Sequence, residues 1–190
     1  MPVPDFSPGE VLTAAAMDSI GLWKVTAATV TAQPTLTVDN CFSANYDNYR
    51  VIVSMNGVSN FNYLAFRVLD SGGSQLSSNY LSSAYAQDYA SATTAFTVLN
   101  SSALTMLGYL PNTSGGHGPM AVQFDIFNPF ASGLRTQMNG LHTGVESGTA
   151  FKAGACFMSR STQEVNRGLV FLNGVGTNMT GTVQVFGYRN

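Results

Sequence analysis

The sequence predicts an all-β protein: a jelly-roll-like antiparallel β-sandwich with an N-terminal extended arm and short helix. The first observation is strict alternation, since Tyr49, Val51, Val53 and Met55 fall on one face of a short run. The second is turn chemistry between such runs, as in Asn-Gly at 56–57. The third is that short runs and turns recur along most of the chain, which is typical of sandwiches and barrels.

Twelve runs are predicted as strands. They are residues 22–30, 34–39, 49–56, 62–69, 79–86, 94–99, 103–110, 119–128, 134–142, 151–158, 167–173 and 181–188. If eight to ten of them are real, two packed sheets of jelly-roll type are favoured. The alternation of Val122, Phe124 and Ile126 with polar residues predicts a strand with one buried face. Asn139-Gly140 has the composition of a further turn.

Residues 1–21 form a separate segment before the sandwich domain, which we assign to residues 22–190. Prolines near the start favour an extended arm, and Ser7 with Glu10 forms a capping box that begins a helix. This helix either plugs one end of the domain or docks on a neighbouring subunit. For docking, the candidate contacts are Pro4, Phe6, Val11, Leu12 and Met17.

The composition excludes several classes of function. Only 9% of the 190 residues are charged and the net charge is −2, so nothing is expected to hold a nucleic-acid backbone. Hydrophobic residues make up 45% of the chain, which argues against disorder. The chain has no signal-peptide pattern and no apolar run of about 20 residues, so no membrane segment is expected. A surface rich in uncharged polar residues suits packing against other subunits.

No pattern of catalytic or metal-ligating residues is present in the sequence. His117 and His142 are isolated, and the ten acidic residues are scattered. We therefore expect no enzyme activity, no cofactor and no metal site, although a triad or a carboxylate pair can assemble only in the fold. Cys41 and Cys156 are expected to be buried free thiols, with a disulfide as the alternative if their strands are neighbours.

The region 70–103 is rich in serine, alanine and tyrosine. It reads either as a set of edge strands or as an adaptable binding surface. In the second reading, Tyr80, Tyr85 and Tyr89 are contacts at the tip of the molecule, and His117 in the glycine-rich loop at 112–118 is another.

Three segments resemble small tailed-phage virion proteins. Phe6-Ser-Pro-Gly-Glu-Val-Leu-Thr-Ala-Ala-Ala-Met-Asp18 is similar to the opening of phage fibre and decoration proteins. Phe42-Ser-Ala-Asn-Tyr-Asp-Asn-Tyr-Arg-Val-Ile-Val53 resembles the strand pair that opens their jelly-roll-like module, and Gly181-Thr-Val-Gln-Val-Phe-Gly-Tyr188 resembles their closing strand. The middle of the chain, residues 70–118, carries no such motif.

The resemblance implies a virion component, assembled in the host cytoplasm, that works by assembly and is usually a homotrimer. One role that it implies is a capsid decoration or cement protein bound to the major capsid protein or another virion protein. The other is a tail fibre or receptor-binding tip that recognises a host surface ligand such as a glycan. The N-terminal arm with its capped helix favours the cement role.

Overall fold

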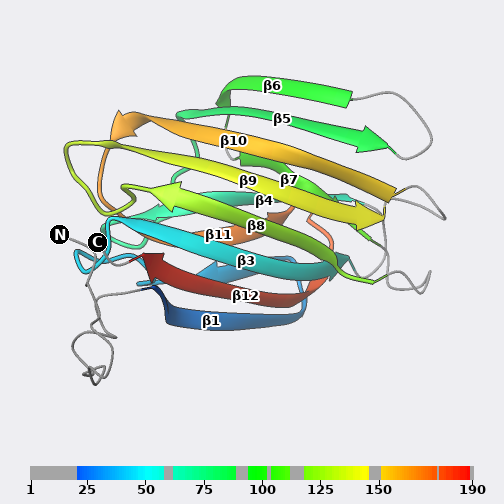
Figure 1. The fold of residues 1–190 in the computed structure, drawn as a ribbon, viewed down its shortest axis with the longest axis horizontal. Coiled ribbons are helices and arrows are strands. Elements are labelled where there is room, and N and C mark those ends of the chain that lie inside the picture. The colour runs from blue at the N-terminus through cyan, green and yellow to red at the C-terminus, as the bar shows by residue number, and fades with distance from the viewer. Residues whose placement is uncertain are drawn as a thin grey trace, which may run out of the picture.

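The residues that the structure describes form twelve β-strands in two layers (Figure 1). The computed structural model describes residues 21–57, 62–88, 94–101, 104–111, 118–145, 151–174 and 176–188. The strands are β1 (Leu22–Gln33), β2 (Thr35–Val38), β3 (Asn48–Gly57), β4 (Asn62–Asp70), β5 (Tyr80–Asp88), β6 (Thr94–Ser101), β7 (Leu104–Leu110), β8 (Met120–Phe127), β9 (Arg135–Val145), β10 (Phe151–Gln163), β11 (Asn166–Asn173) and β12 (Met179–Tyr188).

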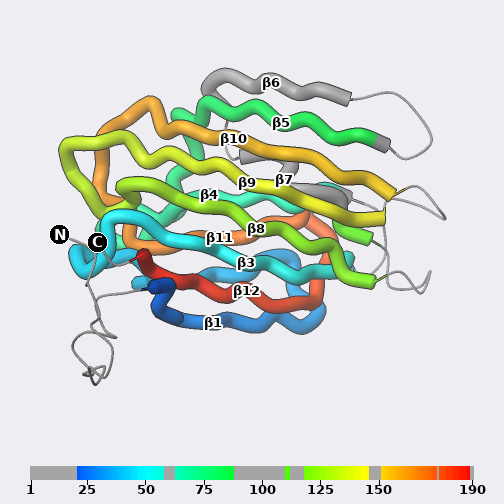
Figure 2. The backbone as a smooth tube through the Cα atoms, viewed as in Figure 1, coloured from blue at the N-terminus to red at the C-terminus, as the bar shows by residue number. Residues whose placement is uncertain are grey.

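The strands form one sheet of eight and one of four. The larger sheet has the order β1-β12-β3-β8-β9-β10-β5-β6, and the smaller has the order β2-β11-β4-β7. Every neighbouring pair is antiparallel. The first and last strands, β1 and β12, lie side by side at one edge of the larger sheet (Figure 2). Because the chain passes repeatedly from one sheet to the other, the connectivity is jelly-roll-like.

Each of the twelve predicted runs coincides with an observed strand, so the predicted all-β antiparallel sandwich is confirmed. The prediction of a turn at Asn139-Gly140 was wrong, because both residues lie inside β9. Gly140 is paired with Phe124, and a Cβ atom at Gly140 would lie 2.5 Å from the Phe124 Cβ. Glycine here therefore permits close packing between strands rather than a turn. The predicted arm and helix at 1–20 lie outside the described residues.

The core between the sheets follows the predicted alternation. The inward residues of β3, which are Tyr49, Val51, Val53 and Met55, are all buried. Val122, Phe124 and Ile126 of β8 are buried next to them. The Phe124 ring stacks at 5.3 Å on Phe66, which belongs to the smaller sheet, so this aromatic pair joins the two layers.

The two cysteines are both buried and unpaired, as the sequence predicted. Burial raises the pKa of Cys41 and of Cys156 to about 12. At neutral pH both are therefore protonated thiols that pack as small hydrophobic side chains.

Within the described residues, three arginines form ion pairs with acidic side chains of the same chain. Arg50 pairs with Asp125, Arg160 with Glu164 and Arg167 with Asp39. Arg160 is the buried member of the set, with 1% of its surface exposed. Its guanidinium group donates to Glu164 and to the backbone carbonyl of Ser78, so it ties β10 to the segment before β5.

Candidate functional site on the outer sheet face

Most residues that the sequence nominated as contacts lie outside the described part of the chain. This is true of Tyr89, of His117 and of the arm residues between Pro4 and Met17. Tyr80 and Tyr85 are described, and both belong to β5. Successive residues of a strand face opposite sides of the sheet. Because Tyr80 and Tyr85 are five positions apart, their side chains lie on opposite faces.

Tyr80 is a framework residue, contrary to its predicted place at a binding tip. None of its surface is exposed. Its hydroxyl group donates to the carbonyl of Leu76 and accepts from the backbone N–H of Val68. The guanidinium carbon of Arg160 lies 4.4 Å from its ring centroid. A tyrosine whose ring and hydroxyl are both occupied in this way offers no surface to a ligand.

Tyr85 lies on the outer face of the eight-stranded sheet, where it is 47% exposed. The strand registers place it in one row with Ala155, Leu141, Gln123 and Ile52, running from β5 across β10, β9 and β8 to β3. Leu141 is 57% exposed and Ile52 is 39% exposed. We call Ile52, Leu141 and Tyr85 the apolar row.

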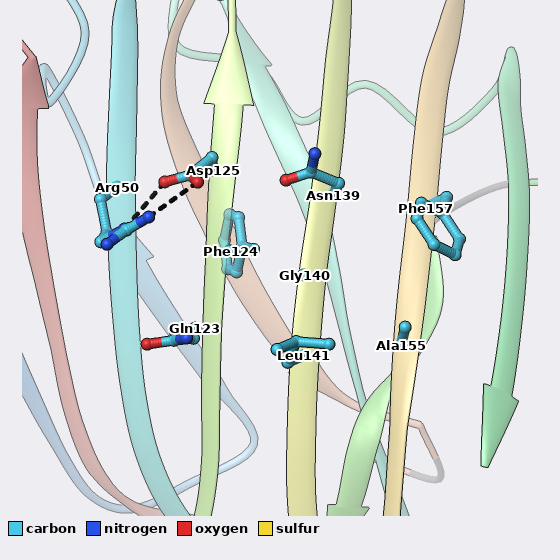
Figure 3. A pocket seen from close by; sticks show the side chains of 9 residues that line it. All are labelled: Arg50, Gln123, Phe124, Asp125, Asn139, Gly140, Leu141, Ala155 and Phe157. Atoms are coloured by element: carbon cyan, nitrogen blue, oxygen red, sulfur yellow. Dashed lines mark hydrogen bonds and ion pairs between the residues drawn. The ribbon is translucent and has the colours of Figure 1, made fainter.

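A second row runs beside the apolar row, two residues along each strand. It consists of Arg50 on β3, Asp125 on β8, Asn139 on β9 and Phe157 on β10. We call it the polar row, although Phe157 ends it with a ring that is 46% exposed. Figure 3 shows the Asn139 amide between the Asp125 carboxylate and the Phe157 ring.

The carboxylate of Asp125 is held in a fixed position. Arg50 donates to both of its oxygens at 2.9 Å, and the Tyr188 hydroxyl donates to Oδ1 at 2.5 Å. Partial burial raises the pKa of Asp125, but the hydrogen bonds from Arg50 and Tyr188 outweigh it, so the pKa lies below its ordinary value. The pKa of Tyr188 is raised to about 12 by burial and by this bond. At neutral pH the carboxylate is therefore charged and the phenol is not.

The outer face is hollowed on both sides of Leu141 and Gln123. The first depression, of about 290 Å³, lies between the two rows and includes Asn139, Asp125 and Phe157 in its lining (Figure 3). The second, of about 300 Å³, lies on the other side and is lined by Ile52 and Thr143 as well. The small side chain of Ala155 leaves the first depression open on the outer face.

Asn139 and Gln123 carry amide groups with unused hydrogen-bonding capacity. No hydrogen bond from either side chain occurs within the described residues, in contrast to the Arg50–Asp125 pair in the same depression. Sequence reasoning missed Asn139 because its Asn-Gly context was read as a turn. The alternation of Gln137, Asn139, Leu141 and Thr143 was the available signal, since these residues share the outer face of β9.

In the described part of the chain, no group of three or more His, Cys, Asp or Glu side chains is placed to hold a metal ion. No helix among these residues has the length and apolar character needed to cross a membrane. No protein-family model, curated protein or solved structure matches the chain.

Proposed function

We propose that the chain is a structural protein of a tailed-phage virion, acting as a capsid decoration or cement protein without enzyme activity. The observation that carries this proposal is the apolar row, in which Ile52, Leu141 and Tyr85 are exposed on one sheet face. In the proposed mechanism, this face covers the major capsid protein or another virion protein. The three segments that resemble phage virion proteins support the same assignment.

The chemistry around the apolar row suits burial against another protein. Its neighbours are mostly uncharged, and the central charges on this face, Arg50 and Asp125, already neutralise each other. Burying such a face removes apolar surface from water at about 25 cal/mol per Å² and leaves few unpaired charges. The loss of translational, rotational and side-chain freedom on binding offsets part of that gain. A single contact is therefore weak, whereas the same contact repeated over many copies is effective.

The test of this proposal places charge in the apolar row. The double variant Ile52→Lys/Tyr85→Lys leaves the core intact, since both side chains are exposed. We expect it to fold and to be lost from capsids during sedimentation. Thr37→Lys is the matched control, because Thr37 is an exposed residue of β2 in the smaller sheet. If the double variant stays on capsids as the control does, docking through this face is wrong.

Two further parts of the proposal have their own measurements. The predicted homotrimer is tested by the mass of the full chain in solution. The predicted arm is tested by deleting residues 1–21, which should reduce retention on capsids while the sandwich remains folded. If the shortened chain is retained on capsids as well as the full chain, the arm does not take part in docking.

A second candidate function is a tail fibre or receptor-binding tip that recognises a host surface ligand. The observation that favours it is the first depression, where unused amides lie next to an exposed aromatic ring. This candidate predicts that the isolated protein binds host cells and competes with infection. Absence of binding to susceptible cells, together with firm retention on capsids, would select the decoration role.

A further inference from the structure

We infer that the first depression on the outer sheet face, centred on Asn139, binds a neutral saccharide. We call it the Asn139 depression. The inference rests on the second candidate function, because a face that covers a capsid would not be open to a sugar. It rests on three observations: a fixed set of polar groups, an exposed aromatic ring beside them, and the cancellation of charge within the depression.

The polar groups match the hydroxyl-rich edge of a sugar ring. Asn139 and Gln123 each offer one acceptor and two donors, none of which is used within the described residues. Asp125 adds acceptor capacity, because a carboxylate has about four lone-pair sites and three are occupied by Arg50 and Tyr188. Since Asp125 is already held by these partners, little ordering is needed when a ligand hydroxyl binds to it.

The apolar groups match the face of a sugar ring that carries C–H bonds. Phe157 and Leu141 border the depression and are about half exposed. The strand carrying Phe157 lies two strands from that carrying Asp125, which is about 10 Å across an antiparallel sheet. A ligand of one or two sugar rings therefore reaches the aromatic ring and the carboxylate together, with Asn139 beneath it (Figure 3).

The charges select a neutral ligand. Arg50 and Asp125 are the charged side chains that line the depression in the described structure, and they form a bidentate pair. An anionic sugar would have to compete with Asp125 for Arg50, and a cation would have to compete with Arg50 for Asp125. A neutral sugar uses the remaining capacity of both amides and of the carboxylate without breaking the pair.

The depression is small and open, so a single site is expected to bind weakly. Its volume of about 290 Å³ is at the lower limit for small-molecule sites. Weak sites become effective when several copies are presented together, as in an oligomer that faces a surface coated with glycans. A binding measurement must therefore use high ligand concentrations or multivalent display.

The experiment is a screen of the full chain on an array of neutral and anionic oligosaccharides. It is followed by NMR titration of the ¹⁵N-labelled chain with methyl glucoside, methyl galactoside, methyl mannoside and N-acetylglucosamine. We expect binding to at least one neutral sugar, with shifts at the Asn139 and Gln123 side-chain amides. Asn139→Ala should weaken binding by about threefold to tenfold, as expected for lost neutral hydrogen bonds. Phe157→Ala should weaken it by at least as much.

Gln137→Ala is the matched control, because Gln137 is an exposed outer-face residue of β9, two positions from Asn139. It should bind as the wild type does, and circular dichroism should show all three variants folded. The inference is overturned if no neutral sugar binds at millimolar concentration, if anionic sugars bind better, or if shifts lie elsewhere on the protein. Retention of Asn139→Ala on capsids is measured in parallel, so that a failure of sugar binding is separated from a failure of the decoration role.

Discussion

The hydroxyl group of Tyr49 closes a ring of hydrogen bonds with the backbone of Ser43. It accepts from the Ser43 N–H at 2.7 Å and donates to the Ser43 carbonyl at 2.9 Å. The Tyr49 ring also contacts Phe42 at 4.8 Å and Tyr46 at 5.6 Å in edge-to-face geometry. One side chain at the start of β3 therefore fixes the loop that enters an interior strand of the larger sheet.

Replacing Tyr49 by phenylalanine should lower the free energy of unfolding by about 2 kcal/mol, because a backbone donor and acceptor of Ser43 lose their partner. Urea denaturation followed by tryptophan fluorescence or circular dichroism measures the change. The control is Tyr85→Phe, since Tyr85 is exposed and its hydroxyl makes no hydrogen bond within the described residues. Equal midpoints for the two variants would show that the Ser43 bonds contribute nothing.

The buried Arg160 predicts that two chemically similar substitutions have unequal effects. Glu164→Gln removes the charge that compensates a guanidinium with 1% exposure, and should cost about 2 kcal/mol, the value for hydrogen bonds to a charged group, because Glu164 itself is partly exposed. Asp39→Asn removes the partner of Arg167 in an exposed pair, and should have little measurable effect. Thermal and urea denaturation of both variants provide the comparison. The prediction is contradicted if the Asp39 variant is the less stable of the two.

The sequence was sufficient to locate the strands because the information is local. Alternation along β3 and β8 identified the buried faces, and turn residues marked most ends. The edge-to-face contact between Tyr46 and Tyr49 is also local, because the two residues are close in the sequence. The order of strands across the sheet is different, since it depends on contacts between distant segments. Nothing near Ile52 indicates that Leu141 and Tyr85 will lie in the same row.

The candidate site escaped prediction for the same reason. Arg50 and Asp125 are unremarkable alone, and they become a fixed pair only because β3 and β8 are neighbours in register. Local composition was misleading for Tyr80, which lies in a polar, tyrosine-rich region but fills a hydrogen-bonded position in the core. Local composition was misleading for Asn139 as well. A glycine after an asparagine can mark a turn, but Gly140 is needed here for close packing on Phe124 within the sheet.

The buried His142 predicts a loss of stability in mildly acidic solution. Burial lowers its pKa below the ordinary value of 6.5, and the nearby carbonyl of Tyr85 opposes this only in part. Neither ring nitrogen makes a well-formed hydrogen bond within the described residues. Below pH 6.5, His142 is protonated in the unfolded chain but stays neutral in the folded chain. The contribution of His142 to the free energy of unfolding is therefore fully present above this pH and is lost as the pH falls toward the pKa of the folded state.

The measurement is the free energy of unfolding as a function of pH, for the wild type and for His142→Met. Below the pKa of the unfolded histidine, the wild type should lose up to about 1.4 kcal/mol per pH unit, and the variant should show a flatter profile. Asp39 and Asp125 have lowered pKa values, so their contributions are lost only at more acidic pH. Parallel profiles for the two proteins would exclude His142 as the source.

Gly154 of β10 predicts the most severe effect of a single methyl group. A Cβ atom there would lie 1.9 Å from the carbonyl oxygen of Tyr85 and 2.8 Å from Nε2 of His142. The first of these atoms is backbone of the neighbouring strand, so β10 and β5 would have to separate to make room. Gly154→Ala should therefore cost at least about 3 kcal/mol, the upper part of the range for overpacked sites.

Gly133→Ala is the control, since a Cβ atom at Gly133 would have no neighbour within 4 Å. It should leave the melting temperature unchanged or slightly raised, because alanine has less freedom than glycine in the unfolded chain. If Gly154→Ala melts with the control, the close approach of β10 to β5 is wrong, and the placement of Tyr85 in the apolar row must then be revised.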